Sequence, residues 1–256
     1  MFAPQGPTLR ELAVQALSSV EHGYDLLAPK FDLTPFRTPE VILASVAGVL
    51  DGLGPFGRGL DLCCGTGAGL GVLGKVCRDG VTGVDISAGM LAVAARAHPE
   101  ATLLRADARA LPLSDGFDLA VSFGAFGHFL PKERPNLFAR TYAALRPGGR
   151  FAFPVVAPFR PGSPGHLALL GFDTAMRVRN ALWRPPFVMY YRGFRLSDVR
   201  QELATVGFGV ELYALEELGR RRDGSPRARL VVATKQGRGL ARTDEAPPST
   251  EEGSPN

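Results

Sequence analysis

The stretch LDLCCGTGAGLGVLG, residues 60–74, joins a short apolar run containing one acid to a series of closely spaced glycines. A strand that ends in a glycine-rich turn and continues into a helix directs backbone N–H groups at whatever lies over the strand's carboxyl end. Glycine in such a turn permits a positive φ and leaves room for a ligand. The stretch therefore predicts a strand, a ligand-binding turn and a helix.

Short apolar runs alternate with longer helical patterns along most of the chain. We expect strands over residues 60–64, 81–84, 102–105, 117–122, 150–156, 210–215 and 228–234. The expected helices between them cover residues 68–78, 87–98 and 134–145, with a further helix from Ser197 to the turn at Gly207. Continuous apolar strands separated by helices are typical of a parallel sheet covered on both faces. The last two strands are expected to form an antiparallel hairpin.

Three segments surround this core. Residues 1–52 predict an N-terminal helical cap, in which Thr8 opens a helix that ends near His22-Gly23, and Thr38 caps a second helix over 41–50. The main domain covers residues 53–236. Within it, residues 157–195 predict a lid insertion around a helix over 164–182. Residues 237–256 carry few apolar side chains, so we expect a disordered tail.

The composition excludes few functions. Of 256 residues, 45% are hydrophobic and 21% charged, which is typical of one globular unit. The net charge of +4 comes largely from arginines interleaved with acids, a weak basis for a nucleic-acid partner. Three cysteines and four dispersed histidines lack the spacing of metal ligands. We expect no metal, no signal peptide, no membrane partner and a cytoplasmic location; the oligomeric state stays open.

Two classes of enzyme use such a glycine-rich turn. A dinucleotide fingerprint requires G-x-G-x-x-G directly after the first strand and an acid about 20 residues later. The matching hexad, residues 69–74, begins a full turn too late, and Asp85 follows it too closely. This match is therefore interpreted as accidental.

Residues 60–69 resemble the first motif of the class I S-adenosylmethionine-dependent methyltransferases, an acid followed by G-x-G-x-G. VTGVDIS at 81–87, RADA at 105–108 and LRPGGR at 145–150 resemble the later motifs, in order. Cys63 replaces the usual first glycine, and some quinone C-methyltransferases also carry a double cysteine there. The resemblance implies S-adenosyl-L-methionine as cofactor and an α/β, Rossmann-like, doubly wound sheet of seven strands with the last antiparallel.

The cofactor's chemistry and the resemblance assign two acids in the same way. Asp85, at a strand's carboxyl end, is expected to accept two hydrogen bonds from the ribose diol. Asp107 is expected to accept from the adenine amine, with the Ala106 or Ala108 backbone N–H facing the ring nitrogens. Alternatively, Asp85 caps the helix before Ser87 and Asp107 only forms a turn.

The remaining expected cofactor contacts come mainly from the glycine-rich turn. Gly65 and Gly67 are expected against the methionine part, while Asp61 holds the loop and reaches the ammonium through water. Cys63 and Cys64 are interpreted as buried filler residues rather than reactive thiols. Further predicted contacts are Cys63 itself, Thr66, Ile86, Met90 and Phe123.

Methyl transfer needs an aligned nucleophile and the exclusion of water, and a base helps when the acceptor is a phenol, a hydroxyl or a protonated nitrogen. His128 is the candidate base or acceptor contact; alternatively it packs or caps a helix. The lid residues Trp183, Tyr190, Tyr191 and Arg192 are expected to contact the acceptor, unless they form the lid's own small core.

The sequence therefore predicts methyl transfer from S-adenosylmethionine to a small-molecule O, N or C nucleophile. RNA or protein methylation is the second hypothesis. Five arginines between 220 and 229 suggest RNA, but no aromatic stacking residues interleave with them. A third hypothesis is a cofactor-binding protein without turnover.

Overall fold

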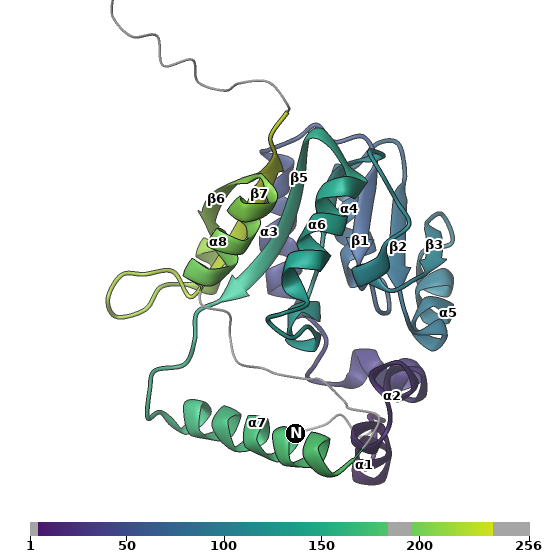
Figure 1. Ribbon diagram of the computed structural model, residues 1–256, viewed down its shortest axis with the longest axis vertical. Helices are drawn as coiled ribbons and strands as arrows, with labels where there is room; N and C mark the ends of the chain where they lie inside the picture. The colour runs from purple at the N-terminus through teal and green to yellow at the C-terminus, as the bar shows by residue number, and fades with distance from the viewer. Residues whose placement is uncertain (1–4, 184–195, 238–256) are drawn as a thin grey trace, which may run out of the picture.

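The computed structural model describes residues 5–183 and 196–237, in which a seven-stranded sheet has helices on both faces (Figure 1). The strands are β1 Gly59–Leu62, β2 Val81–Asp85, β3 Thr102–Arg105, β4 Phe117–Val121, β5 Leu145–Val156, β6 Phe208–Ala214 and β7 Ala228–Lys235. Their order is β3-β2-β1-β4-β5-β7-β6, and β7 pairs antiparallel with both β5 and β6. The predicted fold class is confirmed.

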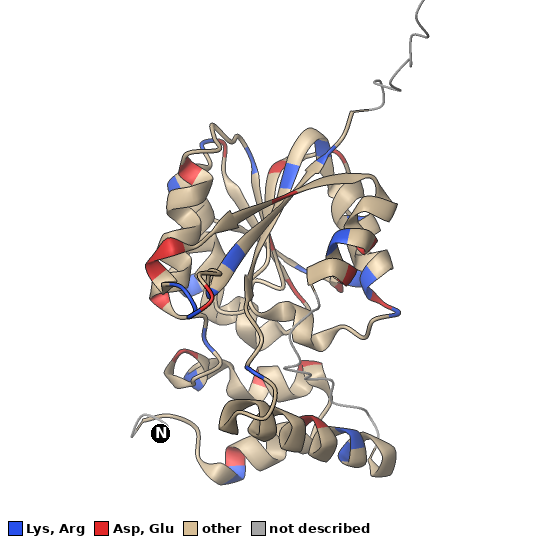
Figure 2. Cartoon of the chain, turned by 90° about the vertical axis from the view of Figure 1, so that its left-hand side faces the viewer, with Lys and Arg blue, Asp and Glu red and all other residues tan. Residues whose placement is uncertain are grey.

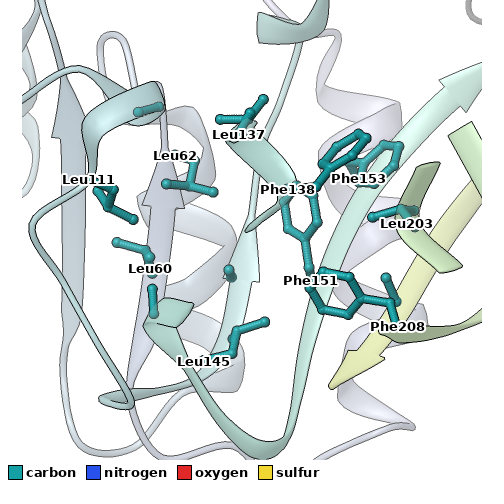
Figure 3. Packing of buried hydrophobic residues seen from close by; sticks show 14 of the residues in the cluster. Leu60, Leu62, Leu111, Leu137, Phe138, Leu145, Phe151, Phe153, Leu203 and Phe208 are labelled. Atoms are coloured by element: carbon teal, nitrogen blue, oxygen red, sulfur yellow. The ribbon is translucent and has the colours of Figure 1, made fainter. Parts of the chain in front are cut away.

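Apolar side chains on both faces of the sheet hold the helices in place. One face packs against α3 Glu40–Asp51, α4 Ala68–Val76 and α5 Ala88–Ala97. The other packs against α6 Arg134–Ala144 and α8 Leu196–Val206, where Phe138 and Leu203 meet Phe151 and Phe153 of β5 (Figure 3). Charged residues lie mainly on the surrounding helices and loops (Figure 2). The sheet is thus a rigid platform whose carboxyl ends carry the connecting loops.

The N-terminal segment forms a cap, with one correction to the sequence-based expectation. Thr8 and Glu11 form the predicted capping box of α1 Leu9–Leu17, but the helix ends there and a second, α2 Val20–Leu27, follows. Ser18 bonds back to the Val14 carbonyl and Ser19 caps α2 through the His22 N–H. Short polar side chains compete in this way with helix hydrogen bonds, which explains the break.

A second correction concerns the start of α3. Thr38 was expected to cap this helix, but Pro39 occupies the N-cap position and no side chain caps the helix. Between α2 and α3, residues Ala28–Leu33 form the 3₁₀ turn η1, which the sequence reading missed.

The predicted lid helix is present as α7 Pro164–Leu182 and lies beside α1 and α2 (Figure 1). Its Met176 packs against Val20 and Tyr24, and the Arg179 guanidinium donates to the Ser18 carbonyl at 3.1 Å. Lid and cap therefore form one layer below the sheet. The predicted tail lies outside the described residues from 238 onward. No helix in the described ranges is long and apolar enough to cross a membrane.

Candidate functional site

A cavity of about 500 Å³ lies between the carboxyl ends of the strands and the cap. It receives side chains from the loops after β1, β2, β3 and β4 and from the cap. Ten of the eleven predicted cofactor residues line it, together with His128: Asp61, Cys63, Gly65, Thr66, Asp85, Ile86, Met90, Asp107, Ala108 and Phe123. The first three motifs of the sequence thus meet in one place, whereas LRPGGR at 145–150 does not line the cavity.

Several predicted site residues lie elsewhere. Gly67 does not line the cavity; with φ at 100°, it passes His98, whose Cδ2 atom would be 2.6 Å from an added Cβ. Trp183 does not line the cavity either and is 52% exposed at the end of α7. Tyr190, Tyr191 and Arg192 lie outside the described residues.

The cap contributes a wall that the sequence reading missed. Tyr24, Phe31 and Phe36 line the cavity from α2, η1 and the following turn, and Arg109 and Glu133 line it from the sheet side. No local pattern marks these residues, because their position follows from how the cap folds over the sheet.

The turn after β1 has an unusual backbone. Cys63 and Gly65 have φ values of 57° and 53°, in the left-handed region that side chains other than glycine rarely adopt. No side chain caps the start of α4, so its first N–H groups face the cavity region. Cys63 occupies this strained position where the motif usually has glycine. Burial and the nearby carboxylates raise the pKa of both Cys63 and Cys64, which keeps these thiols protonated.

The left-handed backbone at Cys63 yields a stability prediction. We expect Cys63→Val to be less stable than Cys63→Gly by about 1–2 kcal/mol, because a branched side chain clashes in this conformation whereas glycine tolerates it. Urea denaturation of both variants and the wild type measures the difference. Equal free energies of unfolding would show that the turn relaxes to a different backbone.

Asp61 is the most deeply buried acid of the cavity. It is 1% exposed, and neither carboxylate oxygen has a hydrogen-bond partner among the described residues. Burial raises its pKa, and the Asp85 carboxylate raises it further; the nearby Leu70 amide opposes the shift without reaching hydrogen-bond geometry. Gly69 leaves the necessary space, because a Cβ there would lie 2.4 Å from Oδ2 of Asp61. The site therefore holds a buried acceptor suited to a cation.

Asp85 joins two loops at the end of β2. Its Oδ2 atom accepts from the Gly65 N–H at 2.9 Å and its Oδ1 atom from the Ser87 N–H at 2.9 Å. Burial raises its pKa, and these backbone donors partly offset the effect. Asp85 therefore does bond to the turn before α5, as the alternative interpretation expects. A carboxylate nevertheless has further acceptor positions for a ligand.

Asp107 is paired on the far side of the cavity. Its carboxylate accepts from the Arg109 backbone N–H at 2.8 Å and from the Arg109 guanidinium, whose Nη2 lies 2.6 Å from Oδ2. This guanidinium lowers the pKa of Asp107 and also bonds Glu133 at 2.6 Å. Asp107 is therefore ionised and fixed in direction.

Three acids of the cap bind three different loops of the sheet. Glu21 contacts Arg105 at 2.6 Å, Asp25 accepts from Ser87 Oγ at 2.6 Å, and Asp32 accepts from Thr66 Oγ1 at 2.8 Å. These contacts hold the cap over the turn, so that the cavity lies between cap and sheet.

His128 lies at the end of the 3₁₀ turn η3 Ala125–His128, after β4. Its Nε2 atom is 2.8 Å from the Tyr24 hydroxyl, and the two rings meet edge to face with centroids 5.2 Å apart. The two residues are 104 positions apart in the chain, and both line the cavity. An imidazole and a phenol in contact can pass a proton between them.

The chain resembles known proteins over the region that builds this site. Residues 60–149 match the family model of a methyltransferase domain. Over 152 residues the chain is 32% identical to a demethylmenaquinone methyltransferase of Renibacterium salmoninarum, covering 54% of this chain and 60% of the relative. The chain thus spans less than two thirds of this curated relative's length.

Solved structures resemble it over most of its length. An S-adenosylmethionine-dependent methyltransferase of Mesorhizobium loti is 27% identical, with a TM-score of 0.53, over 76% of this chain and 99% of that one. A magnesium protoporphyrin IX methyltransferase of Synechocystis with bound SAH is 18% identical, with a TM-score of 0.52, over 76% and 82% of the two chains. The second likeness concerns the fold alone.

Proposed function

Because the chain belongs to the class I S-adenosylmethionine-dependent methyltransferases, we propose that it transfers the cofactor's methyl group to a small-molecule O, N or C nucleophile. One observation carries this proposal most strongly. The buried Asp61 carboxylate, which lacks a hydrogen-bond partner among the described residues, lines the same cavity as Asp85 and Asp107.

The residues present fit S-adenosylmethionine in chemistry and in order. Asp61 supplies a counter-charge for the ammonium group. Asp85 has remaining acceptor capacity for the ribose diol, and Asp107 for the adenine amine. The backbone between Cys63 and Gly65 would lie against the methionine part, since it lines the cavity without bulky side chains. Arg109 would lie beside the adenine ring, since it lines the cavity and holds Asp107.

When bound, S-adenosylmethionine supplies a sulfonium methyl group whose displacement leaves a neutral thioether. The chain's own contribution is to align the acceptor and to keep water out. Phe31 and Phe36 of the cap and Phe123 after β4 supply apolar walls for this purpose. The cap contacts of Asp25 and Asp32 keep those walls closed.

We assign proton removal to the contact between Tyr24 and His128. The acceptor's O–H or N–H proton passes to the Tyr24 oxygen while the Tyr24 proton moves to Nε2 of His128. This leaves an imidazolium and an acceptor with a free electron pair for attack on the methyl carbon. Removal of a proton by a positioned side chain contributes about 10²–10⁴ to the rate of such reactions.

The walls near this contact favour an aromatic acceptor with an ionisable hydroxyl. Phe31, Phe36, Phe129 and Leu130 line the same cavity, and the centroid of the Phe31 ring lies 6.0 Å from that of Tyr24. Aromatic side chains pack well against a flat ring. The curated relative is named for a demethylmenaquinone acceptor, which supports a quinol-type ring here.

Replacement of His128 by alanine is expected to lower turnover about 100-fold while cofactor affinity changes little. Tyr24→Phe keeps the ring and removes the hydroxyl, so it should lower turnover similarly. The double variant should lose little more than either single one, because the two residues act as a unit. Steady-state kinetics and calorimetry of cofactor binding measure these losses of turnover and the unchanged affinity.

The substitution His22→Ala is the control, because His22 is exposed and lies outside the cavity. Full activity of His128→Ala would reduce His128 to a wall residue.

The function itself is tested by incubating the purified chain, labelled S-adenosylmethionine and a host metabolite extract. We expect the label in a small apolar compound. Label in RNA or protein would support the second hypothesis, and cofactor binding without any labelled product would support a protein without turnover.

A further inference from the structure

The helix α7 buries very little of its length. Of its 19 residues, Asp173 and Met176 are the buried ones, and they face the cap. Eight of its exposed residues, all uncharged, recur at intervals of three and four along the helix, which places them on one face. They are Leu167, Ala168, Gly171, Thr174, Ala175, Val178, Ala181 and Leu182. We call these eight residues the α7 strip.

The α7 strip carries no charge and points away from the protein. Leu167 is 58% exposed, Val178 55% and Leu182 75%, and a Cβ added at Gly171 would meet nothing within 4 Å. Exposed large apolar residues are concentrated in this layer of the molecule. Of the 14 found in the described ranges, 12 lie in residues 9–36 or 159–183. Contiguous apolar surface of this kind marks an interaction site.

The charge of the chain is concentrated in the same segment. Residues 157–195 contain six arginines and one aspartate, a formal charge of +5. The chain as a whole carries +4, so all the other residues together carry −1. Among the described residues of α7, the Arg177 side chain is 61% exposed beside the strip and pairs with Asp173, whereas the Arg179 guanidinium turns to Ser18 of the cap. The strip is thus apolar, and the segment that carries it is basic.

We propose that the α7 strip docks on the surface of an anionic lipid bilayer. An amphipathic helix with an apolar face and basic flanks lies in the interface of such a bilayer, its apolar side chains among the acyl chains and its arginines at the headgroups. Basic residues near the surface add attraction to anionic lipids. The helix enters the interface and does not cross it, and this proposal departs from the sequence-based expectation of no membrane partner.

The charge of residues 157–195 argues against two other binding partners for the α7 strip. A second copy of the chain would bring two segments of +5 together. The sole acid of each segment, Asp173, is buried and already paired with Arg177. A nucleic acid matches the basic segment but offers nothing to the uncharged strip within it. An anionic bilayer complements both parts.

Docking in this way would set the cavity beside the bilayer. Met176, on the inner side of α7, packs against Val20 and Tyr24, and both of these line the cavity. The docking surface is therefore one side chain away from the cavity wall. This inference goes beyond the proposed function, because docking does not depend on methyl transfer.

Flotation of the full chain with vesicles tests the proposal. The wild type is expected to float with phosphatidylglycerol–phosphatidylcholine vesicles, less so at high salt, and hardly with phosphatidylcholine alone. The double substitution Val178→Asp/Leu182→Asp should lower vesicle affinity about tenfold or more. It replaces apolar groups that insert into the bilayer by charges that anionic lipid repels. The control Val41→Asp/Val156→Asp changes two exposed apolar residues outside this layer and should float like the wild type.

Circular dichroism and calorimetry of cofactor binding accompany the flotation, so that loss of fold or of the cavity is recognised separately. Failure of the wild type to float, or equal flotation of the Val178→Asp/Leu182→Asp variant, would overturn docking and leave the methyltransferase proposal intact. A lipid-free dimer that this variant dissociates would assign the strip to a second copy instead. RNA binding lost in the same variant would likewise overturn the lipid assignment.

Discussion

Replacement of Asp85 by alanine is expected to weaken S-adenosylmethionine binding about 100-fold or more. The carboxylate is assigned to the ribose diol, and each charge-assisted hydrogen bond is worth about 1.5–3 kcal/mol. The substitution also removes the acceptor for the Gly65 and Ser87 N–H groups, so the turn that faces the methionine part loses its support. Isothermal titration calorimetry measures the loss.

Asp85→Asn separates the two effects. The amide keeps one acceptor oxygen for a backbone donor. It carries no charge, however, so it cannot accept two charge-assisted hydrogen bonds from the diol. We expect intermediate affinity and a free energy of unfolding close to that of the wild type. Unchanged affinity in the alanine variant would remove Asp85 from the cofactor site.

The second large effect is expected at Asp61. At neutral pH, Asp61→Asn should abolish most cofactor affinity, because it removes the counter-charge of the ammonium group. At pH values above the raised pKa of Asp61, the same substitution should stabilise the ligand-free protein by about 1–3 kcal/mol, because an unpaired buried charge is costly. If Asp61 merely supported the loop, its substitution would make the protein less stable. A loss of cofactor affinity together with a gain in stability therefore distinguishes a binding role from a supporting one.

The pH dependence follows from the raised pKa of Asp61. The folded, ligand-free protein holds the proton of the Asp61 carboxyl group more tightly than the unfolded chain does, because aspartates of an unfolded chain titrate near pH 4. Its stability therefore falls as pH rises from about 4 through the raised pKa of Asp61. Over the same window cofactor affinity should rise, because the ionised carboxylate binds the ammonium. In the Asp61→Asn variant, the contribution of this group to the pH dependence of stability and to that of cofactor affinity should vanish. Urea denaturation and calorimetry across pH measure the two dependences. The same pH dependence in the variant and the wild type would contradict the assignment.

The fold and the acids of the site were predictable because their signals are local. Asp61, the glycine turn and α4 are contiguous, and Asp85 and Asp107 each follow directly after a strand. Parallel strands bring their carboxyl ends to one edge of the sheet, so residues far apart in sequence meet there without further information. The lid helix was predicted within a segment that is rich in proline at both ends.

The acceptor side was not predictable in the same way. Tyr24 meets His128 across 104 residues, and Phe31 and Phe36 reach the cavity only because the cap folds over the sheet. The break between α1 and α2 rests on Ser18 and Ser19 competing with helix hydrogen bonds, a balance that periodicity does not reveal. The exposure of the α7 strip likewise depends on which side of the helix meets the cap.

Titration of the unmodified protein with S-adenosylmethionine and, separately, with NADH tests the central claim most directly. The cavity is expected to take up one equivalent of S-adenosylmethionine, to release it to competing sinefungin, and to give no heat with NADH. Saturable NADH binding together with indifference to both sulfonium cofactor and sinefungin would contradict the assignment of Asp61, Asp85 and Asp107.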